Sequence, residues 1–150
     1  MNTTDAIKQA RELMDTHGLQ DWVVRYSPAV KQFGACYYRR KCILLSKALV
    51  ELNDEAEVLD TILHEIAHAL AGAKAGHGAE WRAVCRRIGC RPERCYSSAK
   101  VNTPLPRFKG ECPKCKRVIK RYRRTKISCG TCSPNVFNPD VLFTWERVTT

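Results

Sequence analysis

Residues 64 to 68 read His-Glu-Ile-Ala-His, and this motif constrains the fold more than any other feature of the chain. In a helix, residues four positions apart lie on the same face, so a helical HExxH brings two imidazoles together. Leucine and isoleucine recur around the motif at helical spacing, and Asn53 and Asp54 are N-cap candidates. We therefore predict a mostly buried helix that carries both histidines along one edge.

The two imidazoles on this edge can share one metal ion, which for this motif is typically zinc. Glu65, between His64 and His68, can take a proton from a water at that metal. Catalytic zinc usually has three protein ligands, and His77 in the following glycine-rich segment is the natural third. The alternative for His77 is a solvated loop histidine. Cys85 ranks lower as a ligand, because it lies inside the next helical pattern.

A second cluster of metal-ligand residues lies in the last third of the chain. Cys112 and Cys115 form one CxxC pair, Cys129 and Cys132 form another, and 13 residues separate the pairs. Each pair can present two thiolates to one metal, and four thiolates close a tetrahedral structural zinc site. A redox dithiol would need only one pair. We therefore predict one catalytic and one structural zinc ion, the second holding a small β zinc ribbon.

The basic residues are concentrated in the same region. Residues 101–150 contain 11 Lys+Arg and 3 Asp+Glu, a balance of +8, whereas residues 1–100 have a balance of +3. Such a local excess is the electrostatic footprint of a polyanionic partner, although a solvated basic surface gives the same pattern. Val118, Ile119 and Ile127 suit two strands of a hairpin, with its tip near residues 121–125.

This hairpin carries the candidate DNA-binding residues. Lys and Arg neutralise phosphates, and an aromatic side chain can stack on an unpaired base. Nothing in the segment reads base edges, so we expect weak sequence specificity and a preference for single-stranded or disrupted duplex DNA. The candidates are Arg117, Lys120, Arg121, Tyr122, Arg123, Arg124 and Lys126.

The remaining patterns predict an α+β domain over residues 1–100 and the zinc ribbon over residues 101–150. The domain is expected to be a small antiparallel sheet packed with helices, including the HExxH metal helix. Residues 94–107 are expected to be a linker. The expected elements are a helix over 4–17, strands over 19–27, 34–39 and 42–46, and helices over 47–52 and about 79–88. A further strand is expected over 141–145.

Together these pieces resemble the SprT-like metalloprotease family, which includes Spartan. The resemblance covers roughly residues 5 to 100 and is carried by the segment CILLS, the HEIAH helix and the element HGAEW, with a Cys-rich segment following. It implies a zinc-dependent peptidase with His64, His68 and His77 as ligands and Glu65 as general base. Members of the family act on proteins bound or crosslinked to DNA, and DNA stimulates them.

Two other functions are compatible with the same residues. One is a non-enzymatic, zinc-containing DNA-binding or regulatory protein, although a structural zinc site has no need of Glu65. The other is a metal-dependent hydrolase of a substrate other than protein. The group that stabilises the oxyanion is not identifiable, and the candidate hydroxyls are those of Tyr37, Tyr38 and Tyr96.

Composition restricts the setting in which the protein works. The chain has no apolar run of about 18 residues, so we expect no membrane span. The N-terminal residues 1–15 lack the apolar core of a signal peptide, so we expect an intracellular protein, in the cytoplasm and nucleoid or in the nucleus. We also expect it to be a monomer. The nine cysteines then indicate metal ligands and buried thiols rather than disulfides.

Overall fold

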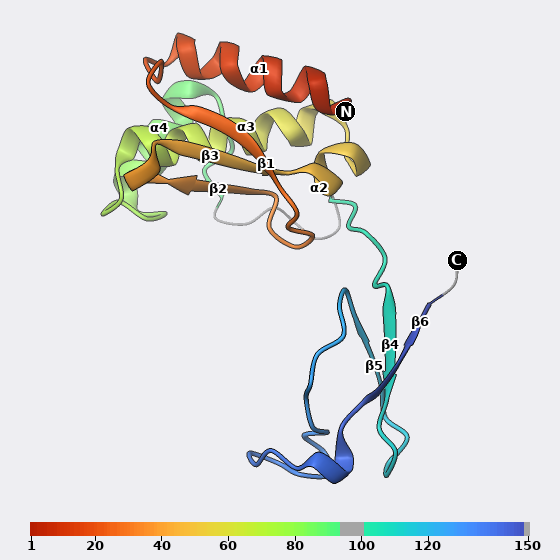
Figure 1. The fold of residues 1–150 in the computed structure, drawn as a ribbon. Coiled ribbons are helices and arrows are strands. Elements are labelled where there is room, and N and C mark those ends of the chain that lie inside the picture. The colour runs from red at the N-terminus through yellow and green to blue at the C-terminus, as the bar shows by residue number, and fades with distance from the viewer. Residues whose placement is uncertain (94–100, 149–150) are drawn as a thin grey trace. The chain divides into compact units, whose positions relative to one another are not determined.

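The computed structural model describes residues 1–93 and 101–148 and divides the chain into two compact units, Met1–Pro104 and Leu105–Thr150 (Figure 1). The first unit therefore ends four residues beyond the predicted boundary. Val101 is buried in its core, and the side chain of Asn53 exchanges hydrogen bonds with the backbone of Asn102. Among the described helices, none has the length and apolar character needed to cross a bilayer.

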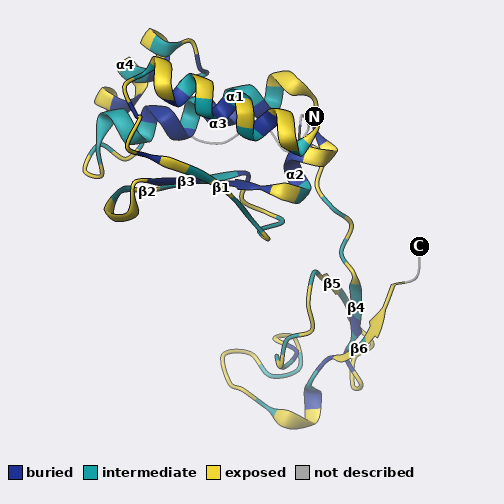
Figure 2. Cartoon of the chain, turned by 45° about the horizontal axis from the view of Figure 1, so that its top comes forward, coloured by how far each residue is buried: buried dark blue, intermediate teal, exposed yellow. Residues whose placement is uncertain are grey.

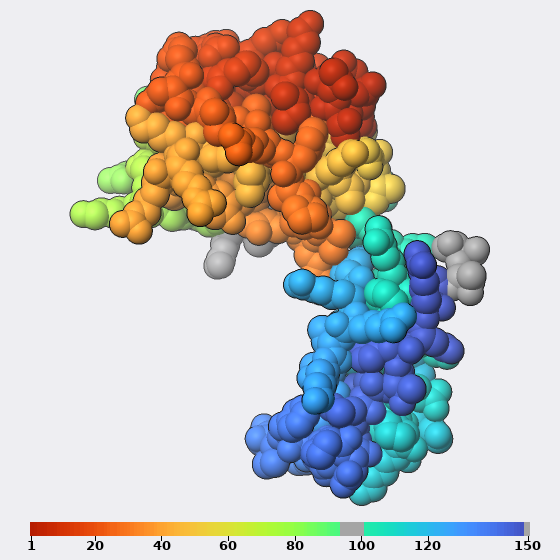
Figure 3. Space-filling model, viewed as in Figure 1, coloured from red at the N-terminus to blue at the C-terminus, as the bar shows by residue number. Residues whose placement is uncertain are grey.

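In its described residues, 1–93 and 101–104, the first unit contains four α-helices and a three-stranded sheet, and the helices lie on one face of the sheet (Figures 1 and 2). α1 forms part of the outer surface of this unit (Figure 3). In chain order the elements are α1 (Thr3–Thr16), β1 (Val23–Ser27), β2 (Gly34–Tyr37), a 3-10 helix (Tyr38–Arg40), β3 (Cys42–Ser46), α2 (Lys47–Leu52), α3 (Glu55–Ala71) and α4 (Ala79–Ile88).

The expectation of an antiparallel sheet is only partly right. The strand order is β1-β3-β2, in which β2 is antiparallel to β3 but β1 is parallel to it. The segment between β1 and β2 carries the chain to the opposite edge of β3, so β1 and β3 point the same way. Alternation of apolar residues is the same in parallel and antiparallel strands, which is why the pattern did not reveal this direction.

The core of the first unit lies between the helices and the sheet, where buried residues concentrate (Figure 2). In α1, Ala6, Ala10 and Met14 recur every four residues and are fully buried, as an amphipathic helix requires. α3 starts where Asp54 caps it, accepting a hydrogen bond from the N–H of Glu57 at 2.9 Å. The cap fixes where α3 begins, and buried residues of the helix belong to this core.

The second unit is a three-stranded antiparallel sheet of order β5-β4-β6. The strands are β4 (Phe108–Glu111), β5 (Val118–Arg121) and β6 (Thr144–Arg147), with a 3-10 helix at Pro139–Val141. The hairpin expected between Ile119 and Ile127 is wrong: β5 pairs with β4, and Ile127 lies outside the strands. Ser128, just before the second CxxC pair, instead forms an isolated bridge with Leu142.

Candidate active site and metal centres

Three imidazoles converge at the end of α3. His64 and His68 lie one helical turn apart, and after the helix ends the chain turns back so that His77 faces them. Gly76 adopts a φ of 50° in this turn, a conformation that glycine accepts without strain. The Nε2 atom of His77 lies 3.2 Å from that of His64 and 3.0 Å from that of His68.

This spacing fits a metal ion. Zinc–nitrogen bonds of about 2.0–2.1 Å in a tetrahedron place the ligand nitrogens about 3.3 Å apart. The two Nε2 distances are within a few tenths of an ångström of that value, and all three nitrogens lie within 4.8 Å of one another. The imidazoles therefore form a three-nitrogen site that leaves one tetrahedral position for water or substrate.

Trp81 forms the floor under the three imidazoles. Its ring centroid lies 4.7 Å from that of His64, 5.2 Å from that of His68 and 4.6 Å from that of His77. The indole is fully buried at the start of α4 and packs with Ala67 and Cys85 in a small core of its own. One side chain thus restricts the tilt of all three rings.

Burial also sets the protonation of the site in the absence of a metal. It lowers the pKa of His64 and of His68 to about 4, and the neighbouring imidazoles add to this effect. Both rings are therefore neutral at pH 7, which is the form that binds a metal. Burial likewise raises the pKa of Glu65 to about 8, and a bound cation would oppose that shift.

The side chain of Glu65 extends from α3 to the first residue of β2, Gly34, and Glu65 is only 6% exposed. A Cβ placed on Gly34 would lie 2.6 Å from both Cγ and Oε1 of Glu65. The carboxyl group therefore sits directly against the backbone of the strand. Because Glu65 is next to His64 in the helix, this contact brings strand, carboxyl group and imidazole cluster together.

A cavity of about 660 Å³ opens beside the histidines. β2 and the residues before it form one wall, and α3 forms another. Tyr37 and Tyr38 both line the cavity, whereas Tyr96 is outside the described residues. Burial, followed by the charges of Cys36 and Glu65, raises the pKa of Tyr38 to about 12, so its hydroxyl stays protonated and able to donate. The residues at this wall are Lys31, Gln32, Phe33, Gly34, Ala35, Cys36, Tyr37 and Tyr38.

Arg91 borders the same cavity and joins the chain after α4 to the metal helix. Its Nε donates to Asp60 at 2.8 Å, and its backbone N–H donates to the same carboxylate at 2.9 Å. Its terminal nitrogens donate to both carboxylate oxygens of Glu57 at 2.6 and 3.2 Å. Asp60 is one turn before His64, so Arg91 braces the stretch of α3 that leads into the site.

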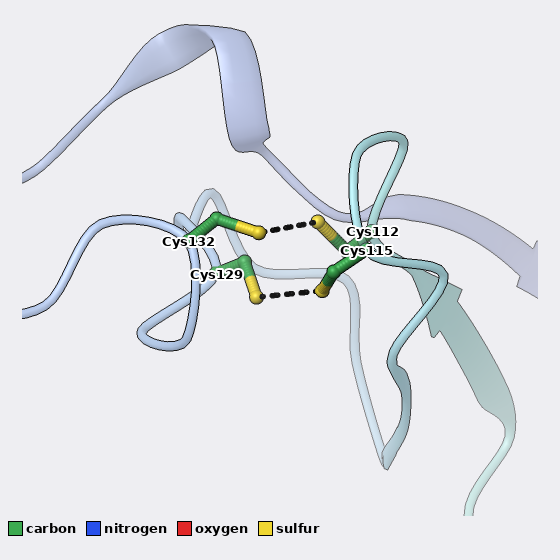
Figure 4. Close-up of side chains that lie close together, drawn as sticks. All are labelled: Cys112, Cys115, Cys129 and Cys132. Carbon is green, nitrogen blue, oxygen red and sulfur yellow. Dashed lines mark hydrogen bonds between the residues drawn. The ribbon is translucent and has the colours of Figure 1, made fainter.

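The four cysteines of the second unit also converge, although their pairing crosses between the motifs (Figure 4). The Sγ atoms of Cys112 and Cys132 are 3.9 Å apart, and those of Cys115 and Cys129 are 3.6 Å apart. Zinc–sulfur bonds of about 2.3 Å in a tetrahedron place ligand sulfurs about 3.8 Å apart. The four thiols therefore fit one zinc ion with no open position.

The electrostatics of Cys129 favour a metal-binding thiolate. Desolvation raises the pKa of this thiol, but hydrogen bonds from the backbone of Cys132 and Thr131 and from the neighbouring thiols outweigh it and bring the pKa to about 6, whereas hydrogen bonding within the same cluster raises the pKa of Cys132 to about 12. A thiolate is the form that binds zinc.

The predicted DNA-binding residues lie in the second unit but not on one face of its sheet. Directly paired residues share a face, so Arg121 and Arg147 flank Phe108, and Arg124 lies over the Phe108 ring at 5.2 Å. Lys120 lies on the opposite face. Of the other candidates, Arg117 donates to the Thr131 hydroxyl, Arg123 and Lys126 are exposed, and Tyr122 is half-buried.

Several further residues have a structural place. Cys85 and Cys90 are buried together behind Trp81, so Cys85 is not among the converging ligands. Cys42 is buried as expected, Cys36 is half-buried beside the cavity, and Cys95 is outside the described residues. Glu80, in the first turn of α4, is exposed.

Two residues at the active site and one in the second unit were not identified from the sequence. Gly34 and Arg91 reach it from distant parts of the chain, and no local spacing connects them to the HExxH motif. Phe108 was missed in the second unit, because it follows a segment that reads as a linker. A glycine at the start of a strand was the only signal for Gly34, and it indicates close backbone approach without naming the partner.

Comparisons with known proteins give one result. The family model described as the SprT-like family matches residues 4–103. No curated protein and no solved structure gave a significant match.

Proposed function

Because the SprT-like family model matches two thirds of the chain, the chain belongs to that family, and we propose that it is a zinc-dependent endopeptidase. We further propose that its substrates are proteins bound or crosslinked to DNA and that DNA stimulates the reaction. The observation that carries the proposal is the convergence of His64, His68 and His77 beside the buried Glu65, at the edge of an open cavity.

The chain's own residues have separate tasks in this reaction. His64, His68 and His77 would hold the zinc ion, which when bound polarises the substrate carbonyl and makes a water more acidic. Glu65 accepts the proton of the attacking water and returns it to the leaving amine. The contact with Gly34 holds that carboxyl group in place, and Trp81 keeps the imidazoles converged.

The basic second unit supports the DNA part of the proposal. Arg121, Arg124 and Arg147 gather around the ring of Phe108, a combination suited to phosphates and an exposed base. The opposite face is less suited, since its Lys109 is paired with Glu146 at 3.1 Å. Contacts of this kind do not read base sequence.

The test is cleavage of a DNA-binding protein, with and without single-stranded DNA. We expect wild-type cleavage to rise with DNA and Glu65→Gln to lose activity by a factor of about 10² to 10⁴, the usual contribution of general acid–base catalysis. Glu80→Gln makes the same chemical change at an exposed position and should cleave normally. Equal activity of Glu65→Gln and wild type would remove the assigned mechanism.

The DNA dependence is tested in the same assay by charge reversal. Arg121→Glu combined with Arg124→Glu should abolish stimulation and leave the DNA-independent rate and the zinc content unchanged. Arg86→Glu combined with Arg87→Glu changes the charge equally on exposed positions of α4 and serves as the control. Undiminished stimulation of the first double variant would contradict a role for this face of the second unit.

A non-enzymatic zinc protein that binds DNA is the alternative, and the basic excess of the second unit favours it as much as it favours the peptidase. It predicts binding of single-stranded DNA without cleavage of any bound protein. Wild type and Glu65→Gln would then behave alike.

A further inference from the structure

Gly34 has no conformational reason to be glycine. It begins β2, it pairs with Leu45 of β3, and its φ is not in the positive region that disfavours other residues. The backbone conformation at position 34 would accept alanine as readily as glycine. The reason lies in what faces it: a Cβ would approach Cγ and Oε1 of Glu65 to 2.6 Å and Cδ to 2.9 Å.

Both sides of this contact are held firmly. The backbone at Gly34 is fixed on β3, where the N–H of Ser46 donates to the carbonyl of Phe33 at 2.7 Å, and Phe33 is itself buried. On the other side, the helix around Glu65 is anchored by the fully buried Ile62 and Ile66. A new side chain at position 34 would therefore displace the Glu65 carboxyl group, the most movable group in the contact.

We propose that Gly34 is a positioning residue for Glu65. The absent side chain leaves a notch in the cavity wall, and the carboxyl group occupies that notch one residue from the metal-ligand candidate His64. Any larger residue fills the notch and pushes the carboxyl group away from the position in which it handles the proton. The catalytic part of this inference rests on the proposed peptidase function, whereas the steric part does not.

The steric part is tested by a thermodynamic cycle on the full-length, zinc-loaded protein. Gly34→Ala is measured by thermal unfolding in wild type, in Glu65→Gln, which keeps the shape of the side chain, and in Glu65→Ala, which empties the notch. We expect Tm to fall by about 4 °C in the first two backgrounds. In Glu65→Ala it should stay the same or rise, because alanine restricts the unfolded chain. An equal change in all three backgrounds would overturn the inference.

The catalytic part is tested by the activity of Gly34→Ala at wild-type zinc content. Displacement of a catalytic group by about 1 Å can cost about 10²-fold, so we expect a loss of that order in kcat with little change in KM. Val23→Ala changes an exposed position of β1 in the same sheet, outside the cavity lining, and should retain the wild-type kcat. Wild-type kcat in Gly34→Ala would overturn the positioning role.

The two arms separate failure of the inference from failure of the proposed function. Suppose that wild type cleaves, that Gly34→Ala is equally active, and that the change in Tm caused by Gly34→Ala is the same in every Glu65 background. The inference about Gly34 then fails, and the proposed peptidase function stands. If wild type cleaves no protein while the unfolding cycle gives the expected dependence, the notch is upheld and the peptidase function fails.

Discussion

Glu65 is the residue whose chemistry depends most on its surroundings. Its carboxyl group is almost removed from water, and burial raises its pKa to about 8. A bound cation would bring this pKa back down toward the operating pH, which is where a general base works best. The same burial has a cost, because ionising a desolvated carboxyl group destabilises the folded state.

This cost predicts a pH dependence of stability in the metal-free protein. Between pH 4.5 and 8 folded Glu65 holds a proton that the unfolded chain has released, so its contribution to stability falls as pH rises through that window. Glu65→Gln does not ionise, so we expect it to gain stability relative to wild type from pH 5 to pH 8. Urea denaturation of both proteins in EDTA measures this, and a constant difference between them would contradict it.

At the scale of elements, α3 is the part on which the site is built. Its buried residues pack in the core, its half-buried edge carries His64 and His68, and its first two turns carry the acids that bind Arg91. Arg91 follows α4, the helix that holds Trp81. One guanidinium thus links the metal helix to the element that supplies the floor of the imidazole cluster.

Removing this link should loosen the site without removing a ligand. Arg91→Ala leaves Glu57 and Asp60 unpaired at half-buried positions, and we expect a loss of about 1–3 kcal/mol in the free energy of unfolding. Arg86→Ala, on the exposed face of α4, should change stability by less than about 0.5 kcal/mol. Denaturant titration of both variants makes the comparison, and equal losses would show that the link contributes nothing of its own.

At the scale of the whole molecule, the protein is two units, each with its own cluster of metal ligands. The first unit has an extended apolar core, whereas the buried hydrophobic cluster of the second consists of Val141, Phe143 and two of the cysteines themselves. A piece of this size has too small a core to fold alone, so a metal would supply much of its folding free energy.

We therefore expect two zinc ions per chain, held independently. His68→Ala and Cys129→Ser should each lose one ion and retain the other, as measured by mass spectrometry of the metal content. Only Cys129→Ser should lose the NMR signals of the second unit, while those of the first unit remain. One zinc ion in the wild-type protein, or loss of both in either variant, would contradict this independence.

Local patterns were enough to predict much of the fold. Helices over 47–52 and 79–88 have the predicted bounds, and α1 is displaced by a single residue, because apolar spacing and capping act within a few turns. The predicted hairpin in the second unit is wrong because strand pairing is not decided within a few residues. Which strands pair depends on contacts between distant segments, and β4 lies in a stretch without clear periodicity.

The sequence by itself determined the two groups of metal-ligand residues, because HExxH on a helix and paired CxxC motifs each place donors by local geometry. The tertiary structure alone decided that Gly34 abuts Glu65, that Trp81 lies beneath all three imidazoles and that Arg91 braces α3. These contacts join residues whose separation in the chain carries no periodic signal. Only the packing of helices against the sheet brings them together.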